Sequence, residues 1–125
     1  MNKVEFFKCN VCGNIVEIIK GNGASIKCCG EQMTKLVPNT MDASTEKHVP
    51  YYEKNGDEII VKIGSVEHPM TEEHYIMWIV YVSNNVVTRV SFKPGDKIEE
   101  HFKYVPDSEI YAYCNLHGLW MNKVV

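Results

Sequence analysis

The chain has 125 residues, of which 45% are hydrophobic and 23% are charged, and its formal net charge is −3. This composition excludes a disordered chain, and the length has room for one ordinary domain or for a small metal-stabilised unit joined to a modest domain. No segment approaches the ~18 to 20 consecutive apolar residues of a membrane span, and the first residues do not resemble a signal peptide. We therefore expect a cytoplasmic protein with no membrane partner.

The charges and the cysteines restrict the function further. Residues 1–37 contain five lysines against three acidic residues, and the remainder contains eight Lys and Arg residues against thirteen acidic ones. This distribution lacks the basic surface of a nucleic-acid-binding protein. The five cysteines are an odd number, and disulfides are rare in a reducing compartment. Metal binding therefore explains the cysteines better than a disulfide framework does.

Residues 1–37 are predicted to form a small unit that depends on a metal. Short strands are expected over residues 4–8 and 15–19, on either side of a turn from Cys9 to Gly13. A segment of this size cannot bury enough apolar surface to fold alone, so a metal ion, a dimer partner or both must stabilise it. The chain near Pro38 is expected to be a linker, and a second domain is expected over residues 38–125.

The second domain is predicted to be all-β. The Asn55-Gly56 pair predicts a hairpin with a type I′ turn, and the apolar run from His74 to Val82 predicts a buried strand. Further strands are expected over residues 59–63, 86–92, 98–104 and 109–114. About six short strands separated by regular turns are typical of an immunoglobulin-like β-sandwich.

Four cysteines, which we call the thiol cluster, have the spacing of a metal site: Cys9, Cys12, Cys28 and Cys29. Two pairs of thiolates suit tetrahedral S4 coordination, and the glycine after each pair lets the chain turn back toward the sulfurs. Zinc and a single iron ion both accept this donor set, so the spacing leaves the metal open. Buried free cysteines or a vicinal disulfide are the less favoured alternative.

Five further residues, which we call the imidazole cluster, form a second candidate metal site: His48, His68, His74, Cys114 and His117. A structural zinc site closes at four ligands, so five ligands suggest an octahedral metal with one position left open. Strand ends and the loops after them are places where a rigid scaffold meets solvent and can hold such a metal. His101 lies outside this pattern, and we interpret it as an ordinary polar residue.

The order and spacing of both clusters resemble the desulfoferrodoxin family over essentially the whole chain. The thiol cluster is similar to that of desulforedoxin, and three segments resemble superoxide reductase: Glu46-Lys47-His48, His68-x5-His74 and Cys114-Asn115-x-His117. The resemblance implies two iron ions per chain. An Fe(Cys)4 centre would lie in a desulforedoxin-like domain over residues 1–37, and an Fe(His)4(Cys) centre in a superoxide reductase domain over residues 38–125. It also implies a homodimer.

The same resemblance implies the one-electron reduction of superoxide to hydrogen peroxide at the Fe(His)4(Cys) centre, for detoxification under oxidative stress. The imidazoles would surround the iron, the Cys114 thiolate would lie on one axis, and superoxide would bind on the opposite axis. Lys47 would supply the local cation that attracts the anion to an acidic domain, and Glu46 would take the open position in the resting ferric state. A small donor protein such as rubredoxin would supply the electrons.

Three other functions remain open on the sequence. A non-enzymatic iron electron carrier or redox sensor would need only sites such as Fe(Cys)4, and a zinc-binding interaction module would need only residues 1–37. A superoxide dismutase would have to both oxidise and reduce superoxide. The open position expected in the second site favours the reductase over the electron carrier.

Overall fold

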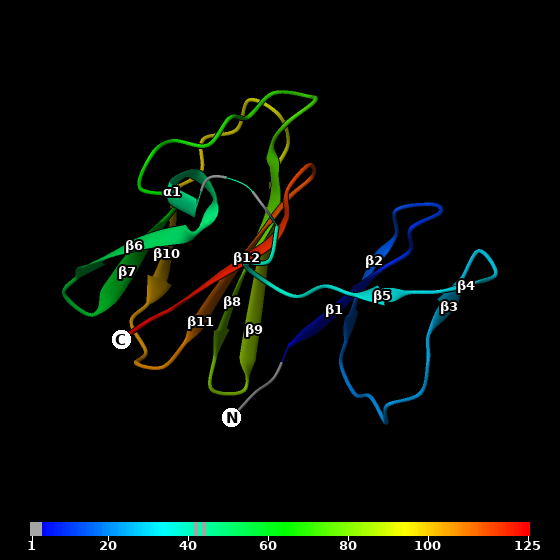
Figure 1. The fold of residues 1–125 in the computed structure, drawn as a ribbon. Coiled ribbons are helices and arrows are strands. Elements are labelled where there is room, and N and C mark those ends of the chain that lie inside the picture. The colour runs from blue at the N-terminus through cyan, green and yellow to red at the C-terminus, as the bar shows by residue number, and fades with distance from the viewer. Residues whose placement is uncertain (1–3, 42, 44) are drawn as a thin grey trace. The chain divides into compact units, whose positions relative to one another are not determined.

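The computed structural model describes residues 4–41, 43 and 45–125, without the side chains of residues 45 and 46. The chain divides into two compact units, Met1–Val37 and Pro38–Val125. Both consist of short antiparallel strands (Figure 1), and the helix of the described residues is the single turn α1 (Thr45–His48). The all-β class expected from the sequence is confirmed. No helix among the described residues is long and apolar enough to cross a membrane.

The first unit has two small sheets. Its strands are β1 (Glu5–Lys8), β2 (Ile15–Ile18), β3 (Lys27–Cys28), β4 (Glu31–Gln32) and β5 (Thr34–Lys35). Strand β1 pairs with β2 and β5, and β3 pairs with β4. The predicted strands at β1 and β2 are confirmed, but β3, β4 and β5 were missed because strands of two residues carry no periodicity.

The second unit has a three-stranded and a four-stranded sheet (Figure 1). The first sheet, in the order β10-β7-β6, contains β6 (Pro50–Asn55), β7 (Glu58–Ile63) and β10 (Glu100–Lys103). The second, in the order β12-β11-β8-β9, contains β8 (Ile76–Ser83), β9 (Val86–Ser91), β11 (Glu109–Cys114) and β12 (Gly118–Lys123). The predicted β-sandwich is confirmed. Strand β12 was missed, because its buried Leu119 and Trp120 are adjacent and do not alternate.

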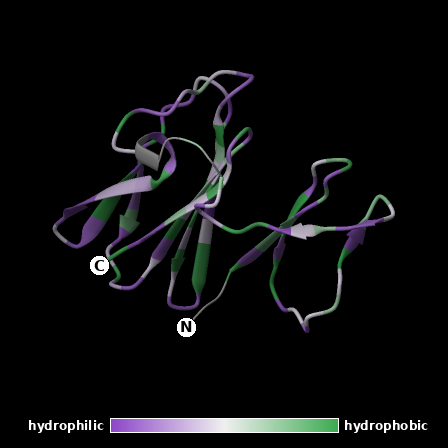
Figure 2. Cartoon of the chain, viewed as in Figure 1, coloured by the Kyte–Doolittle hydropathy of each residue, from purple (hydrophilic) through white to green (hydrophobic). Residues whose placement is uncertain are grey.

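Side chains that alternate along these strands form the core of the second unit. Successive residues of a strand point to opposite faces, so every second side chain of β7 and β11 is buried between the sheets. The contributors are Ile59, Val61 and Ile63 from β7 and Ile110, Ala112 and Cys114 from β11. In Figure 2 the turn between β8 and β9 is hydrophilic, and strands β7 and β11 carry both hydrophobic and hydrophilic residues. Cys114 is thus a core residue at the end of a strand, where a loop begins.

The hairpin between β6 and β7 differs from the type I′ prediction. Asn55 pairs with Glu58, so the two central residues of the turn are Gly56 and Asp57. Gly56 has a φ of 66°, and Asp57 does not have a positive φ. A positive φ at the first central residue alone is the pattern of a type II′ turn, which favours glycine there. The predicted hairpin is confirmed, and the predicted turn type is wrong.

His101 lies on β10 and contacts two carboxylates, one of which belongs to the neighbouring strand β7. Its Nδ1 is 3.0 Å from Oε1 of Glu58 on β7, and its Nε2 is 3.5 Å from Oε2 of Glu99. The hydrogen bond to Glu58, followed by that to Glu99, raises the pKa of His101. A raised pKa means that the folded protein binds this proton more tightly than the unfolded chain does.

We predict that His101→Gln destabilises the protein only at low pH. The contribution of a group with a raised pKa is fully present below its unfolded pKa, about 6.5 for histidine, and is lost as the pH rises through the folded pKa. Urea unfolding at about pH 5.5 should show a lower midpoint for the variant, and at about pH 8.5 the midpoints should coincide. An equal loss at both pH values would mean that the ion pairs do not cause the effect.

Candidate metal centres

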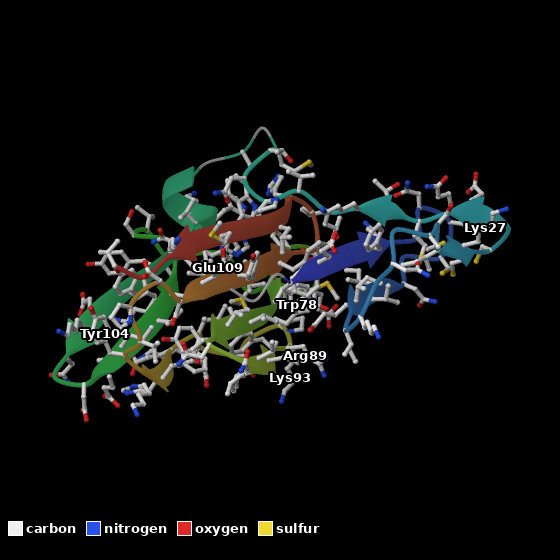
Figure 3. All side chains as sticks on the ribbon, turned by 90° about the horizontal axis from the view of Figure 1, so that it is seen from below. Lys27, Trp78, Arg89, Lys93, Tyr104 and Glu109 are labelled. Atoms are coloured by element: carbon white, nitrogen blue, oxygen red, sulfur yellow. The ribbon has the colours of Figure 1, made fainter. Side chains whose placement is uncertain are left out.

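The thiol cluster is formed by two segments of the first unit. Cys9 and Cys12 follow β1, Cys28 ends β3, and Cys29 lies in the turn after it. The four Sγ atoms lie within 4.8 Å of one another, with Cys12 and Cys28 at 3.7 Å and Cys28 and Cys29 at 3.9 Å. Figure 3 shows sulfur atoms gathered beside the labelled Lys27, which precedes Cys28. The structure therefore brings all four predicted cysteines to one point.

The backbone around the thiol cluster is bent toward the sulfurs. Gly13 and Gly30 have φ values of 82° and 75°, as expected for glycines that turn the chain after a cysteine pair. Cys29 itself has a φ of 55°, which is uncommon for a residue with a side chain. This strained conformation lets two adjacent cysteines both aim their sulfurs at the cluster.

The titration of the thiols shows why a cation fits here. A hydrogen bond from the backbone of Cys12 is the main cause that lowers the pKa of Cys9 to about 7. In contrast, the side-chain hydrogen bond with Cys12 is the main cause that raises the pKa of Cys29 to about 12. Four thiolates this close repel one another, so all four lose their protons only around a metal cation.

The imidazole cluster is assembled from distant parts of the second unit. His48 ends α1, His68 and His74 lie between β7 and β8, and Cys114 ends β11. One ligand atom from each of these four residues lies within 4.8 Å of the others. His117 follows in the turn to β12, with its Nδ1 3.0 Å from Nε2 of His48 and 4.0 Å from Sγ of Cys114. All five predicted residues therefore lie together.

The four imidazole rings surround one point. In the order His48, His68, His74 and His117, neighbouring centroids around the circuit are 4.6, 4.6, 5.0 and 4.8 Å apart. Neighbouring ring planes cross at 78°, 79°, 80° and 90°. The His48 and His74 rings lie opposite each other at 6.1 Å and within 27° of parallel. This square arrangement lets one nitrogen of each ring face a shared metal ion.

Two ring nitrogens in this square are buried without a protein partner. Nδ1 of His68 is 2.7 Å from the carbonyl oxygen of Pro69, which leaves Nε2 as its free ligand atom. Nε2 of His68 and Nε2 of His74 have no hydrogen-bond partner among the described atoms. Leaving such a group unsatisfied costs about 1–3 kcal/mol. A bound metal would satisfy both nitrogens.

Burial also keeps these imidazoles in the form that binds metal. Burial is the main cause that lowers the pKa of His68 to about 4, and it also lowers the pKa of His74. The two rings are therefore neutral at pH 7, as ligation requires.

Cys114 is the one sulfur donor of the imidazole cluster, and it is fully buried. Burial raises the pKa of its thiol, while the backbone N–H groups of Leu116 and His117 act in the opposite direction by donating hydrogen bonds to the sulfur. A nearby metal cation would complete the deprotonation. The two N–H donors would then temper the charge of the thiolate.

Trp120 is a supporting residue that sequence analysis missed. Its indole stacks on the His48 ring at 5.0 Å and 26°, and its Nε1–H donates to the carbonyl oxygen of His117 at 3.1 Å. The side chain is fully buried. One residue thus supports two of the predicted ligands. Its position three residues after His117 was the only signal for it in the sequence.

The two predicted non-ligand residues precede His48. Lys47 is exposed, and its charge helps to lower the pKa of His74, after the larger effects of burial and of two neighbouring histidines. Its charge therefore reaches His74 in the imidazole cluster, and its action on the substrate stays a prediction. The side chain of Glu46 lies outside the described part of the structure.

Comparisons with known proteins cover both units of the chain. A family model described as desulfoferrodoxin matches residues 40–123, and one described as the desulfoferrodoxin N-terminal domain matches residues 1–36. A desulfoferrodoxin of Syntrophotalea carbinolica is 48% identical over 122 residues, 97% of each chain. A superoxide reductase of Pyrococcus abyssi is 38% identical over 74% of this chain and 97% of its own.

A solved structure covers nearly the whole chain. The superoxide reductase of Treponema pallidum matches with a TM-score of 0.75 and 34% identity, over 98% of this chain and 100% of its own. The two family models cover the two units, and the two donor sets fit one Fe(Cys)4 and one Fe(His)4(Cys) centre. The chain belongs to the desulfoferrodoxin family.

Proposed function

We propose that this protein is a superoxide reductase that converts superoxide to hydrogen peroxide in the imidazole cluster. The observation that carries the proposal is the square of four imidazoles beside the buried thiol of Cys114. Five donors leave an octahedral metal one position for a small substrate. The superoxide reductases among the similar proteins support the same reaction.

When bound, a ferrous ion would supply the electron that, with two protons, converts one superoxide to one hydrogen peroxide. The protein's own part is to hold the donors in the correct protonation state. Burial keeps His68 and His74 neutral, and the N–H groups of Leu116 and His117 stabilise the Cys114 thiolate. An external donor must return the electron after each turnover.

Lys47 and Glu46 are proposed to act on substrate and on the open position. Lys47 is exposed next to His48, so it can attract an anion through solvent to an otherwise acidic unit. Glu46 precedes it and would close the open position in the resting oxidised state. Both roles rest on the resemblance to the family together with the position of these residues beside a predicted ligand.

The thiol cluster is proposed to store and transfer electrons. Its Cys12 and Cys29 are exposed, whereas the Cys114 thiol of the other cluster is buried, so electrons from a partner would enter the first centre readily. On this proposal residues 1–37 form the desulforedoxin-like Fe(Cys)4 domain and residues 38–125 form the catalytic domain. The compact units Met1–Val37 and Pro38–Val125 support this division.

Further properties complete the proposal. A rubredoxin-like donor is expected, because a one-electron reductase needs a one-electron partner. A homodimer is expected, because the first unit carries a groove of about 570 Å³ lined by residues such as Phe7, Ile18 and Ile26, and Ile19 is 96% exposed. Five cysteines without a disulfide suit the cytoplasm, where the protein would remove superoxide under oxidative stress.

The yield of peroxide tests the proposed reaction directly. The reduced protein should form one hydrogen peroxide for each superoxide consumed, whereas a dismutase forms one for every two. Pulse radiolysis with a peroxide assay measures both quantities. A protein that exchanges electrons with its donor and does not consume superoxide would be an electron carrier instead.

We predict that Cys114→Ser removes the thiolate-to-Fe(III) charge-transfer absorption of the second centre and most of its superoxide reduction. Serine keeps the size of the side chain but replaces the thiolate donor with a hydroxyl. The Fe(Cys)4 spectrum of the same molecule is the control and should persist. An unchanged absorption and rate would remove Cys114 from the ligands.

A second variant, Cys29→Ser, should abolish the Fe(Cys)4 spectrum and make residues 1–37 sensitive to proteolysis. The reason is that metal binding supplies folding free energy to a unit this small. Limited proteolysis with mass spectrometry locates the new cleavage sites. Iron and absorption of the second centre should be retained; their loss would contradict the proposed division into two domains.

The role of Lys47 can be separated from general charge effects. We expect Lys47→Ala to slow the second-order reaction with superoxide by about tenfold or more, because it removes electrostatic attraction. Lys123→Ala removes the same charge at the distal end of β12 and should have little effect, as should Glu46→Ala. Iron content should be unchanged in all three variants, and the spectra of Lys47→Ala and Lys123→Ala should match that of the wild type.

Salt dependence provides an independent check on Lys47. Raising the ionic strength from ~0.01 to ~0.1 M shortens the screening length from about 30 to about 10 Å. The wild-type reaction should therefore slow more than that of Lys47→Ala. Equal salt dependence of the two rates would mean that Lys47 does not steer the substrate.

A further inference from the structure

The pairing of β8 with β11 changes register immediately before the imidazole cluster. Tyr113 pairs with Trp78, but the next residue, Cys114, pairs with Ile76. Met77 is therefore an extra residue on β8, and its carbonyl oxygen instead accepts a hydrogen bond from the N–H of Phe92 at 2.8 Å. One residue without a counterpart on the partner strand is a β-bulge.

The buried side chains show the same break. Along β11 the core residues alternate regularly, whereas the core residues of β8 are separated by two positions and then by three: Ile110, Ala112 and Cys114 on β11, and Tyr81, Ile79 and Ile76 on β8. A regular strand would keep a period of two throughout. The bulge therefore shifts which face the residues before Met77 present to the core.

This shift selects His74 as the residue that can meet Cys114. In a regular pairing Cys114 would lie opposite Met77, and alternation would place Tyr75 on the face of Cys114. With the bulge, Cys114 lies opposite Ile76, so the residue two positions earlier, His74, shares its face. The structure accordingly places a His74 ring nitrogen within 4.8 Å of the Cys114 sulfur.

Beyond Ile76 the regular ladder ends and Asn115 continues the contact between the two chain segments. The backbone N–H of Asn115 donates to the carbonyl oxygen of Tyr75 at 3.2 Å. Its Oδ1 accepts a hydrogen bond from the N–H of Tyr75 at 2.9 Å, and its Nδ2 donates to the carbonyl oxygen of Glu73 at 3.0 Å. These three bonds hold the backbone on both sides of His74.

The hydrogen bonds of the His74 backbone itself are local. Its N–H donates to the carbonyl oxygen of Thr71 at 3.2 Å, and the N–H of Thr71 donates to the carbonyl oxygen of His74 at 2.9 Å. These bonds shape the turn from Thr71 to His74 but do not join it to the Cys114 loop. The side chain of Asn115, together with its backbone N–H, makes that connection.

We propose that Asn115 is a positioning residue that, together with the bulge at Met77, aims Nε2 of His74 at the metal held by Cys114. The three hydrogen bonds of Asn115 would fix the direction in which the buried, unpartnered Nε2 of His74 points. The inference concerns metal binding, so it holds whether or not the bound iron reacts with superoxide. Loss of the Asn115 side-chain hydrogen bonds would leave His74 present but poorly oriented toward the metal.

The test is the rate at which the second centre loses iron to a colorimetric ferrous chelator. Loss of a group that orients a metal ligand typically weakens metal binding by about 10–100-fold. We expect iron release from Asn115→Ala to be about 10–100-fold faster than from the wild type, with an altered thiolate charge-transfer absorption. The Fe(Cys)4 centre of the same molecule should keep its spectrum and its iron.

Two further variants separate orientation of His74 from general stability. Ser108→Ala removes a buried side-chain hydrogen bond to Val105 at the opposite end of β11 from Cys114, and it should leave iron release unchanged. Asn115→Asp keeps an acceptor for the Tyr75 N–H but cannot donate to Glu73 when ionised, so its release rate should lie between those of Asn115→Ala and the wild type.

The test compares the rates of iron release from the variants, and the stability of each variant is measured alongside. Release from Asn115→Ala that is no faster than from Ser108→Ala overturns the proposal, even if both variants unfold more easily than the wild type. If Asn115→Ala does not fold, the same comparison is made with Asn115→Asp, and a wild-type release rate in that variant overturns the proposal.

Discussion

The convergence of buried nitrogen and sulfur donors on one point is the constraint on which the second unit depends. Nε2 of His68 and of His74 lie in the interior without protein partners, beside the fully buried thiol of Cys114. Each unsatisfied polar group destabilises the fold by about 1–3 kcal/mol. A metal ion offsets these costs together, because it binds both nitrogens and stabilises the thiolate. The apolar sandwich around the site supplies the rest of the folding free energy.

The β-sandwich provides rigidity where the donors need it. Cys114 is both the last core residue of β11 and a predicted ligand, so packing and metal binding fix the same side chain. Trp120 on β12 supports His48 by stacking and His117 by a hydrogen bond. The more irregular segment that carries His68 and His74 is held by its contacts to these strands. The neighbouring strands thus fix the positions of the metal ligands that lie in loops.

The two centres differ in their donor atoms and in their exposure, and these differences suit them to different tasks. The first has only sulfur donors, two of them exposed, in a unit whose small size makes it depend on its metal. The second has four imidazoles and one buried thiol, and its donor set leaves a position for substrate. A four-sulfur site suits electron transfer, and a five-donor site suits chemistry on a small ligand.

Much of this organisation could be predicted from the sequence, because it depends on residue type and spacing. The paired cysteines, the histidines and the alternating apolar runs indicate two clusters and a β-sandwich. Short strands such as β3 and β4 could not be predicted, since two residues show no period. Strand β12 was missed because its two buried residues are adjacent.

The sequence by itself determined which donors are available; the tertiary structure decided which of their atoms meet. The square order of the imidazoles depends on how α1, the 64–75 segment and the turn after β11 come together. The type II′ turn at Gly56 and the bulge at Met77 depend on strand register, which is a property of pairs of strands. A local pattern cannot specify such pairings, because their partners lie far apart along the chain.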